Sequence, residues 1–214
     1  MYLEIKLKTY LTIIRHGETE WNRIGKQQGQ LNSDLSENGI KQAQAIKEYI
    51  KNEYDLIISS DLGRALQTAE IISEKFKYKI ILNPGLRERH LGIMQGLTME
   101  EFKEAYHEEY KKFASSDPDY IIPEGESARQ RYDRAIDTFN KIINDYKGKN
   151  LLIVAHGGIL DSIFRYVLNI PIKQKRSFSL INASINKFSF ENSWMLESWG
   201  QINHMQEIIA LDDF

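Results

Sequence analysis

The feature that most constrains the fold is a regular alternation of short apolar runs with amphipathic stretches. Runs of strand length occupy residues 8–14, 55–58, 79–82 and 151–155, and stretches with helical spacing of apolar residues separate them. The last run is apolar at every position, which is typical of a central parallel strand covered on both faces. The sequence therefore predicts an α/β fold, a three-layer sandwich with a mostly parallel central sheet and helices on both faces.

Capping residues predict where several of the helices begin. Ser36 is a good N-cap for a helix that follows it, Asp61 is placed to cap the next helix, and Thr98 with Glu101 has the spacing of a capping box. Gly148 ends a long amphipathic helix, and residues 17–33 are expected to form a loop. The apolar faces predicted for these helices include Ile40, Ala43, Ile46 and Ile50, then Ala65, Leu66, Ala69 and Ile72, then Phe102, Ala105, Tyr106, Tyr110 and Phe113.

The chain is expected to form one domain over residues 1–214. Residues 97–147 join the third and fourth predicted strands and are expected to form a helical lid over the active site, although the spacing of Phe102, Tyr106 and Phe113 favours core positions for these aromatics. Residues 178–200 are rich in aromatic and β-branched residues and predict a C-terminal hairpin. The tail after residue 200 shows no readable pattern.

Composition excludes several classes of function. The chain has no cysteine, which removes disulfides, thiolate metal sites and cysteine-nucleophile chemistry. A formal net charge of -2 gives no reason to expect a nucleic-acid or membrane partner, and neither a transmembrane span nor a signal peptide is evident. We expect a cytoplasmic globular protein, a monomer or a homodimer, that needs no cofactor.

Charged side chains follow the ends of the predicted strands. Arg15 and His16 end the first run, Arg64 follows the second, Glu88 the third and His156 the fourth. Ligands of parallel α/β sheets bind beyond the carboxyl ends of the strands, so these side chains are expected to converge. Two arginines, two histidines and one carboxylate make an anion pocket of phosphate size. A structural role, with Arg64 paired to Glu88 and both histidines filling polar gaps, explains any one of these residues but not all of them.

These residues lie in blocks that resemble the histidine phosphatase superfamily, in its phosphoglycerate-mutase-like branch. The blocks occur in the family's order and cover most of the chain. They are Arg15 to Asn22, Gln28-Gly29, Asp34-Leu35-Ser36 with Gly39 and Gln42-Ala43, Ser59 to Ala65 with Thr68-Ala69, Leu86-Arg87-Glu88 with Gly92 and Gly96, and Val154 to Gly158.

The resemblance implies a role for each of the five converging residues. His16 would be the nucleophile that forms a phosphohistidine, and two nearby arginines would keep it unprotonated. Arg15, Arg64 and His156 would hold the phosphoryl oxygens as charge develops on them. Glu88 would act as general acid toward the leaving oxygen and then as base for water.

Further residues are expected to bind the substrate. In relatives, positions matching Asn22, Gln28 and the amide of Gly29 supply neutral hydrogen bonds, although these are also ordinary loop residues. We also assign Arg89, His90 and Gly157 to substrate binding, while His90 has the alternative of capping a turn. No residue is assigned to a metal.

The predicted reaction is metal-independent phosphomonoester hydrolysis of a small phosphorylated metabolite. Glu88-Arg89-His90-Leu91-Gly92 is closer to the mutase form of this block, which makes a cofactor-dependent phosphoglycerate mutase-type phosphotransferase the alternative. The short segment from Thr98 to Ser127 and the loop Pro123 to Ser127 favour a compact phosphatase. The candidate substrates are sugar phosphates, phosphoglycerates, nucleotide-like phosphates and ribazole phosphate.

Two alternative functions from other classes of protein are kept open, a metallohydrolase and a catalytically inactive binding module. A metallohydrolase would use His16 and His156 as ligands, but two fixed cations beside a dication are costly, and no His-Glu-x-x-His spacing occurs. A catalytically inactive phosphate-binding or partner-binding module would have lost a nucleophile or an arginine, and here every expected position is filled.

Overall fold

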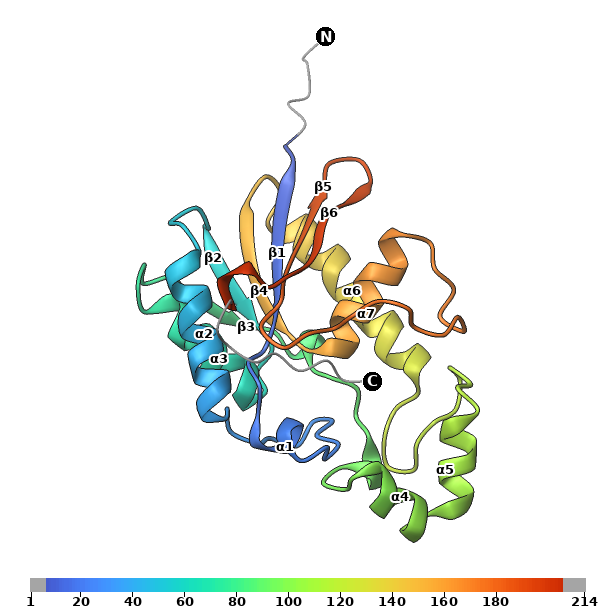
Figure 1. Cartoon of the computed structure of the whole chain (residues 1–214). Coiled ribbons are helices and arrows are strands. Elements are labelled where there is room, and N and C mark those ends of the chain that lie inside the picture. Colours follow the sequence, from blue (N-terminus) through green and yellow to red (C-terminus); the bar gives the residue numbers. More distant parts are fainter. Residues whose placement is uncertain (1–6, 206–214) are drawn as a thin grey trace.

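The computed structural model describes residues 7–205, and a six-stranded mixed sheet forms its centre. The strand order is β3-β2-β4-β1-β5-β6; β1 to β4 are parallel, and β5 and β6 form a C-terminal antiparallel hairpin beside β1 (Figure 1). This confirms the predicted mostly parallel sheet with a hairpin. The strands are β1 (Thr9–Arg15), β2 (Leu56–Ser59), β3 (Ile80–Leu82), β4 (Asn150–Ala155), β5 (Ile185–Phe190) and β6 (Trp194–Gln201).

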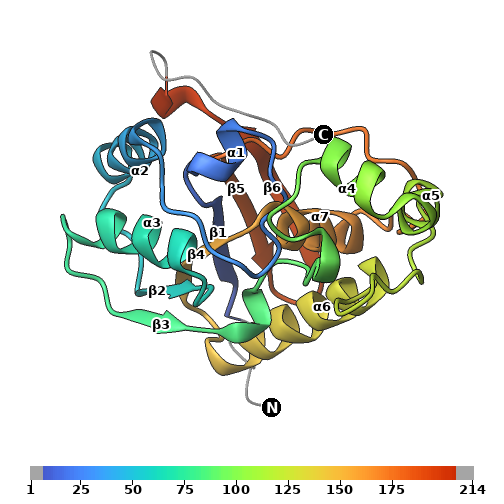
Figure 2. The same cartoon turned by 90° about the horizontal axis from the view of Figure 1, so that it is seen from below.

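Helices lie on both faces of the sheet, with α2 and α3 on one side and α6 and α7 on the other (Figure 2). No helix among residues 7–205 has both the length and the apolarity that crossing a membrane requires. The helices are α1 (Glu20–Arg23), α2 (Glu37–Tyr49), α3 (Gly63–Ser73), α4 (Met99–Ala105), α5 (His107–Ala114), α6 (Ala128–Asp145) and α7 (Gly157–Val167), with short 3₁₀ turns η1 (Pro84–Leu86), η2 (Gly92–Met94) and η3 (Asn203–Met205).

Successive residues of the central strands pack into two separate hydrophobic cores, one on each face of the sheet. Ile13 packs with α6 and α7, while its neighbour Ile14 packs with α2 and α3. Ile153 and Val154 divide in the same way on β4. Side chains of a strand alternate between faces, so a strand between two helical layers has to be apolar at consecutive positions. This burial fixes where β1 and β4 end, and therefore where Arg15 and His156 lie.

The helical insertion is narrower than the predicted 97–147. Met94, Phe102 and Ile122 form a small core of their own beneath α4 and α5. Helix α6 belongs instead to the main sandwich, since Phe139 and Ile142 on its inner face are buried against the sheet. Helices α4 and α5, in the segment before α6, lie away from the sheet (Figure 1).

Several local predictions are corrected by the structure. Asp61 does not cap α3: its carboxylate pairs with Arg87 in a two-hydrogen-bond contact, and Leu62 takes the N-cap position without a side-chain bond. The helix predicted through Tyr106 breaks there into α4 and α5, which leaves Tyr106 41% exposed rather than in the core. The hairpin begins at residue 185 instead of 178, and the predicted loop 17–33 contains the short helix α1.

Two glycines let α2 approach the loop that follows β1. A Cβ on Gly39 would lie 1.9 Å from the carbonyl oxygen of Glu18, and a Cβ on Gly17 would lie 2.6 Å from the carbonyl oxygen of Gly39. Both obstacles are backbone atoms, which cannot rotate away. Glu18 adds a second tie, because its carboxylate accepts a hydrogen bond of 2.6 Å from the Ser36 hydroxyl. The start of α2 therefore sets the path of the loop immediately after His16.

Replacing Gly39 with alanine should destabilise the protein. The added methyl group has to displace backbone at Glu18, and overpacking of this kind costs about 1–3 kcal/mol. Urea unfolding should show a lower midpoint for Gly39→Ala, whereas Gln44→Ala on the exposed face of α2 should change the free energy of unfolding by less than about 0.5 kcal/mol. Equal midpoints for Gly39→Ala and wild type would show that the close approach is not required.

Candidate active site

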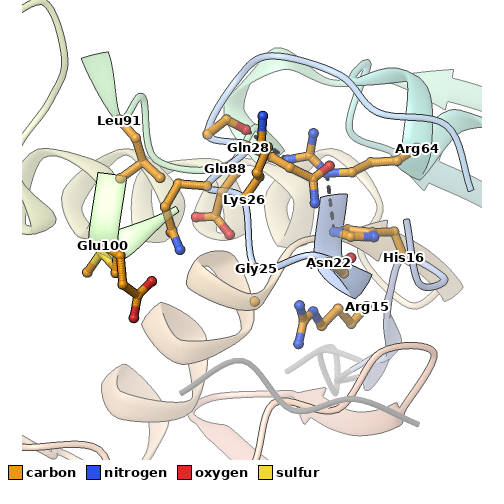
Figure 3. A pocket seen from close by; sticks show the side chains of 14 residues that line it. Arg15, His16, Asn22, Gly25, Lys26, Gln28, Arg64, Glu88, Leu91 and Glu100 are labelled. Atoms are coloured by element: carbon orange, nitrogen blue, oxygen red, sulfur yellow. Dashed lines mark hydrogen bonds between the residues drawn. The ribbon is translucent and has the colours of Figure 1, made fainter. Parts of the chain in front are cut away.

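A cavity of about 430 Å³ opens at the carboxyl ends of β1 and β4. Arg15, His16, Arg64, Glu88 and Gly157 are among the residues that line it. Figure 3 shows the side chains of Arg15, His16, Arg64 and Glu88. The structure thus brings together four of the five side chains predicted to converge, and they follow the ends of three strands, β1, β2 and β3. The fifth, His156, is fully buried directly behind His16, with ring centroids 5.1 Å apart.

His16 presents a lone pair to the cavity. Its Nδ1 lies 2.8 Å from the carbonyl oxygen of Gly17, and since a carbonyl only accepts, Nδ1 carries the ring hydrogen. Nε2 is therefore the unprotonated nitrogen, and it accepts a hydrogen bond of 3.2 Å from Nε of Arg64 (Figure 3). The ring is oriented by its own backbone, with the nucleophilic nitrogen turned toward a guanidinium group.

Arg15 and Arg64 are held by neutral carbonyl oxygens. Arg64 donates through Nη1 to Leu31 and through Nη2 to Gly29, each at 2.8 Å, and Arg15 donates to the carbonyl of Leu180. Both arginines are only 1% exposed. Carbonyl oxygens orient a guanidinium group without cancelling its charge. The cavity therefore keeps a concentrated positive potential beside His16.

The buried charges hold both histidines neutral. Burial lowers the pKa of His16 well below its ordinary value of 6.5, and the charges of Arg64 and Arg15 lower it further. Burial also lowers the pKa of His156 well below 6.5, with Arg64 as the next cause. An imidazole that stays neutral keeps its lone pair at physiological pH.

Ser60 contacts the buried His156. The Ser60 hydroxyl accepts a hydrogen bond from the amide of Leu62 and lies 2.8 Å from Nε2 of His156, a contact in which either group can donate. Within residues 7–205, Nδ1 of His156 has no hydrogen-bond partner. Buried polar atoms are normally satisfied, so this nitrogen beside His16 is a candidate contact for a ligand.

Glu88 is oriented by two backbone amides. Oε1 accepts from the amide of Arg89 at 2.7 Å, and Oε2 accepts from the amide of Gly158 at 2.8 Å, in the first turn of α7. The residue is half-buried on the cavity wall. Its carboxyl group thus has a fixed direction and access to a ligand, the two requirements for proton transfer.

The three neutral loop residues also line the cavity. Asn22 completes the capping box of α1, whose N-cap is Thr19, and its side-chain oxygen accepts from the amide of Thr19 at 3.1 Å. Gly29 has a positive φ of 54°, and its carbonyl holds Arg64. Gln28 is buried, and among residues 7–205 its Oε1 has no hydrogen-bond partner. Gln28 is therefore available to bond a ligand at the cavity wall.

Two predicted substrate-binding residues do not line this cavity. The guanidinium of Arg89 bonds to the carbonyls of Glu126 and Tyr120, and burial lowers the pKa of Arg89 to about 10. The Nδ1 atom of His90 accepts from the amide of Gly92, a contact of the kind that its alternative role of capping a turn requires. Both side chains stabilise the insertion, because Arg89 bonds to carbonyls in the loop before α6 and His90 bonds to the first residue of η2.

Other cavity residues were not predicted. Lys26, Leu91, Met99 and Glu100 also line the cavity, the last two from the start of α4. Figure 3 shows Leu91 and Glu100 on the side away from His16. Their types are ordinary for surface segments, and only the tertiary path brings them here. Among the described residues, no three histidine, aspartate or glutamate side chains gather in a way that could hold a metal ion.

The stability of the protein should fall as the pH drops below 6.5. The unfolded chain then binds protons on its histidines, while the buried His16 and His156 resist protonation because their folded pKa values are depressed. Between pH 7.5 and 5.5, each such histidine should cost about 1.4 kcal/mol of unfolding free energy. Urea titrations at the two pH values should show that the unfolding free energy falls less in His16→Ala than in wild type. The difference should be about 1.4 kcal/mol, the contribution of one buried histidine. Parallel pH profiles would mean that His16 titrates normally in the folded protein.

Comparisons with known proteins agree with the geometry of the cavity. The family model described as "Histidine phosphatase superfamily (branch 1)" matches residues 11–201. The "Metal-independent phosphoserine phosphatase" of Arabidopsis thaliana is 39% identical over 205 residues, covering 94% of this chain and 84% of the relative. The "Probable phosphoglycerate mutase GpmB" of Proteus mirabilis is 36% identical over 217 residues, covering 97% of this chain and 98% of the relative.

A solved structure extends the agreement to three dimensions. The phosphoserine phosphatase of Entamoeba histolytica in complex with 3-phosphoglyceric acid superposes with a TM-score of 0.79 at 30% identity, covering 92% of this chain and 98% of that one. The relatives match nearly the whole length of the chain, including the segments that carry the cavity. The chain therefore belongs to the histidine phosphatase superfamily, branch 1, as a compact phosphoglycerate mutase-like member.

Proposed function

We propose that this protein is a metal-independent phosphomonoesterase that acts through a phosphohistidine intermediate on a small phosphorylated metabolite. The observation that carries the proposal is the neutral His16, whose Nε2 lone pair faces a cavity beside two buried arginines. A nitrogen nucleophile needs an unprotonated lone pair, and a phosphoryl group needs fixed positive charge around its oxygens. Both conditions are met at one point.

In the first step, Nε2 of His16 attacks phosphorus and the bond from phosphorus to the ester oxygen breaks. The phosphoryl oxygens take over the hydrogen bond that Arg64 gives to Nε2, and they also bond to Arg15. Nδ1 of His156 supplies one more donor when it carries the ring hydrogen. Glu88 gives its proton to the departing oxygen, so an alcohol leaves rather than an alkoxide.

In the second step, water attacks the phosphohistidine on the side that the alcohol has left. Glu88, now a carboxylate, takes a proton from the water as the new oxygen–phosphorus bond forms and the nitrogen–phosphorus bond breaks. Inorganic phosphate leaves and His16 is again neutral. The same carboxyl group serves as acid and base because its direction is fixed by the amides of Arg89 and Gly158.

Phosphotransfer is the second candidate, since a relative 36% identical over nearly the full chain is named as a phosphoglycerate mutase. The two functions differ in what attacks the phosphohistidine: water in a hydrolase, a second substrate hydroxyl in a mutase. Incubating 3-phosphoglycerate with the protein, with and without a bisphosphoglycerate primer, distinguishes them. We expect inorganic phosphate to be released; formation of 2-phosphoglycerate without phosphate release would establish the transferase instead.

Replacing His16 with alanine should reduce phosphatase activity below detection, because no other group can form the covalent intermediate. Acid-labile phosphate trapped on the wild-type protein from a labelled substrate should disappear in the same variant. His107→Ala, on the exposed face of α5, provides the matched control and should retain both signals. Turnover that survives in His16→Ala, or wild-type turnover that is abolished by EDTA, would contradict the mechanism.

Replacing Glu88 with glutamine should slow alkyl phosphate esters by roughly 10²- to 10⁴-fold, since an alkoxide leaves poorly without a proton. Hydrolysis of nitrophenyl phosphate should slow far less, because nitrophenolate leaves without protonation. The ratio of kcat values for the two esters, measured in wild type and variant, isolates the proton-transfer role. If both esters slow equally, Glu88 has only a structural role.

A further inference from the structure

The two peptide groups that follow His16 are held by buried side chains. In the first group, the carbonyl oxygen of His16 accepts a hydrogen bond of 3.1 Å from Nδ2 of Asn182, and the amide of Gly17 donates to Oγ1 of Thr68 at 3.1 Å. The Thr68 hydroxyl in turn donates to the carbonyl of Arg64 at 2.7 Å. The first peptide group is thus fixed at both ends, and Thr68 links it to the arginine that contacts Nε2 of His16.

The second peptide group carries the carbonyl that orients the His16 ring. The carbonyl oxygen of Gly17 lies 2.8 Å from Nδ1 of His16. At the other end of the same peptide group, the amide of Glu18 donates to Oε1 of Gln42 at 2.8 Å. The carbonyl and the N–H of a planar trans peptide point in opposite directions. The bond to Gln42 therefore sets the direction in which the Gly17 carbonyl faces, and with it the direction of the ring.

Gln42, Thr68 and Asn182 are each 0% exposed and come from three separate parts of the fold. Gln42 and Thr68 belong to α2 and α3, which pack on the same face of the sheet (Figure 2), whereas Asn182 precedes β5. Burying an amide or a hydroxyl costs free energy unless the group is hydrogen-bonded. None of the three lines the cavity, so contact with a ligand there does not explain their positions. Their bonds to the backbone after His16 do explain them.

The Gly17 carbonyl matters most while phosphorus bonds to His16. As the bond from Nε2 to phosphorus forms, the imidazole ring gains positive charge, and its Nδ1 hydrogen becomes a stronger donor. The acceptor is a neutral carbonyl, so the strength of this hydrogen bond depends on how well the carbonyl is aligned and polarised. Gln42 contributes to both, because hydrogen bonds that form a chain polarise one another.

We infer that Gln42 is a positioning residue for the nucleophile: by bonding to the Glu18 amide it keeps the ring hydrogen of His16 on Nδ1 and directs the Nε2 lone pair into the cavity. Thr68 and Asn182 hold the preceding peptide group in the position that this requires. The three side chains act through the backbone and contact neither the phosphoryl group nor the leaving group. The inference rests on the proposed phosphohistidine mechanism and adds the residues that prepare its nucleophile.

Gln42→Met removes the acceptor and keeps a side chain of similar length. Phosphoenzyme formation from labelled nitrophenyl phosphate, followed by rapid quench, should slow by about 10- to 100-fold, because a small misplacement of a reacting group costs this much. The inhibition constant of inorganic phosphate should change by less than about twofold, because Arg15 and Arg64 keep their carbonyl partners. Gln44→Met makes the same substitution on the exposed face of α2 and should leave both values unchanged.

Nitrogen-15 NMR of histidine-labelled protein reports the tautomer of His16 without any turnover, and His16→Ala identifies its signals. In the ligand-free wild type the hydrogen should be on Nδ1, whereas Gln42→Met should show a mixture of the two tautomers. Gln42→Glu keeps an acceptor oxygen in the same place, so it should retain the wild-type tautomer and at least about a third of the wild-type rate.

Thr68→Val removes the hydroxyl that binds the Gly17 amide while keeping the shape of the side chain. It should lower the rate of phosphoenzyme formation and mix the tautomers of His16 in the same way, and it provides the test even if Gln42→Met does not fold. The wild-type rate and tautomer in Thr68→Val would overturn the inference. A Gln42→Glu protein as slow as folded Gln42→Met would also overturn it.

A merely structural role predicts a different result. In that case phosphate binding would weaken as much as phosphoenzyme formation slows, in Gln42→Met or in Thr68→Val, and the inference would be wrong. Failure of the phosphatase proposal is distinguishable from both results, because the wild type would then form no phosphoenzyme. The NMR spectra would still show whether Gln42 sets the tautomer of His16.

Discussion

Two buried guanidinium charges beside two uncharged imidazoles are the constraint on which this molecule depends. Taking a cation out of water costs several kcal/mol, and carbonyl oxygens of Gly29, Leu31 and Leu180 recover part of that cost by accepting hydrogen bonds. Those oxygens leave the positive charge in place. The same charge therefore keeps His16 unprotonated and would attract a phosphate dianion, which are the two conditions that the proposed reaction requires.

Much of the fold follows from local pattern. Consecutive apolar residues such as Ile13 and Ile14 are informative because only a strand between two helical layers buries both neighbours. Once β1 and β4 are parallel neighbours, the residues after them have to meet at one edge, and this places Arg15, His16 and Gly157 on one cavity. The residues of the site that directly follow a strand can therefore be predicted from the sequence, because the predicted sheet fixes where they lie.

What could not be predicted depends on partners distant in the sequence. Asp61 has the sequence position of a helix cap, yet a bidentate partner at Arg87 outcompetes the backbone amides. Arg89 has the type and position of a substrate ligand, but carbonyls of the insertion bind its guanidinium. Ser60 gave no signal, because a serine after a strand is common and its importance comes from lying 2.8 Å from His156. In each case a long-range hydrogen bond decides between two locally reasonable roles.

The architecture separates the chemistry from the choice of substrate. Arg15 ends β1, His16 follows it, His156 follows β4, and Arg64 lies in the first turn of α3, and the two main cores hold these elements in place. The surrounding walls come from the segment with the small core under α4 and α5 on one side, and from the irregular chain between α7 and β5 on the other. Changes there alter what surrounds the phosphoryl group without moving His16. This separation explains how relatives similar over nearly their whole length can be named for both a phosphatase and a mutase. In the mechanism that we propose, the inner site forms the phosphohistidine, and the outer walls determine which hydroxyl, that of water or of a bound metabolite, can reach it.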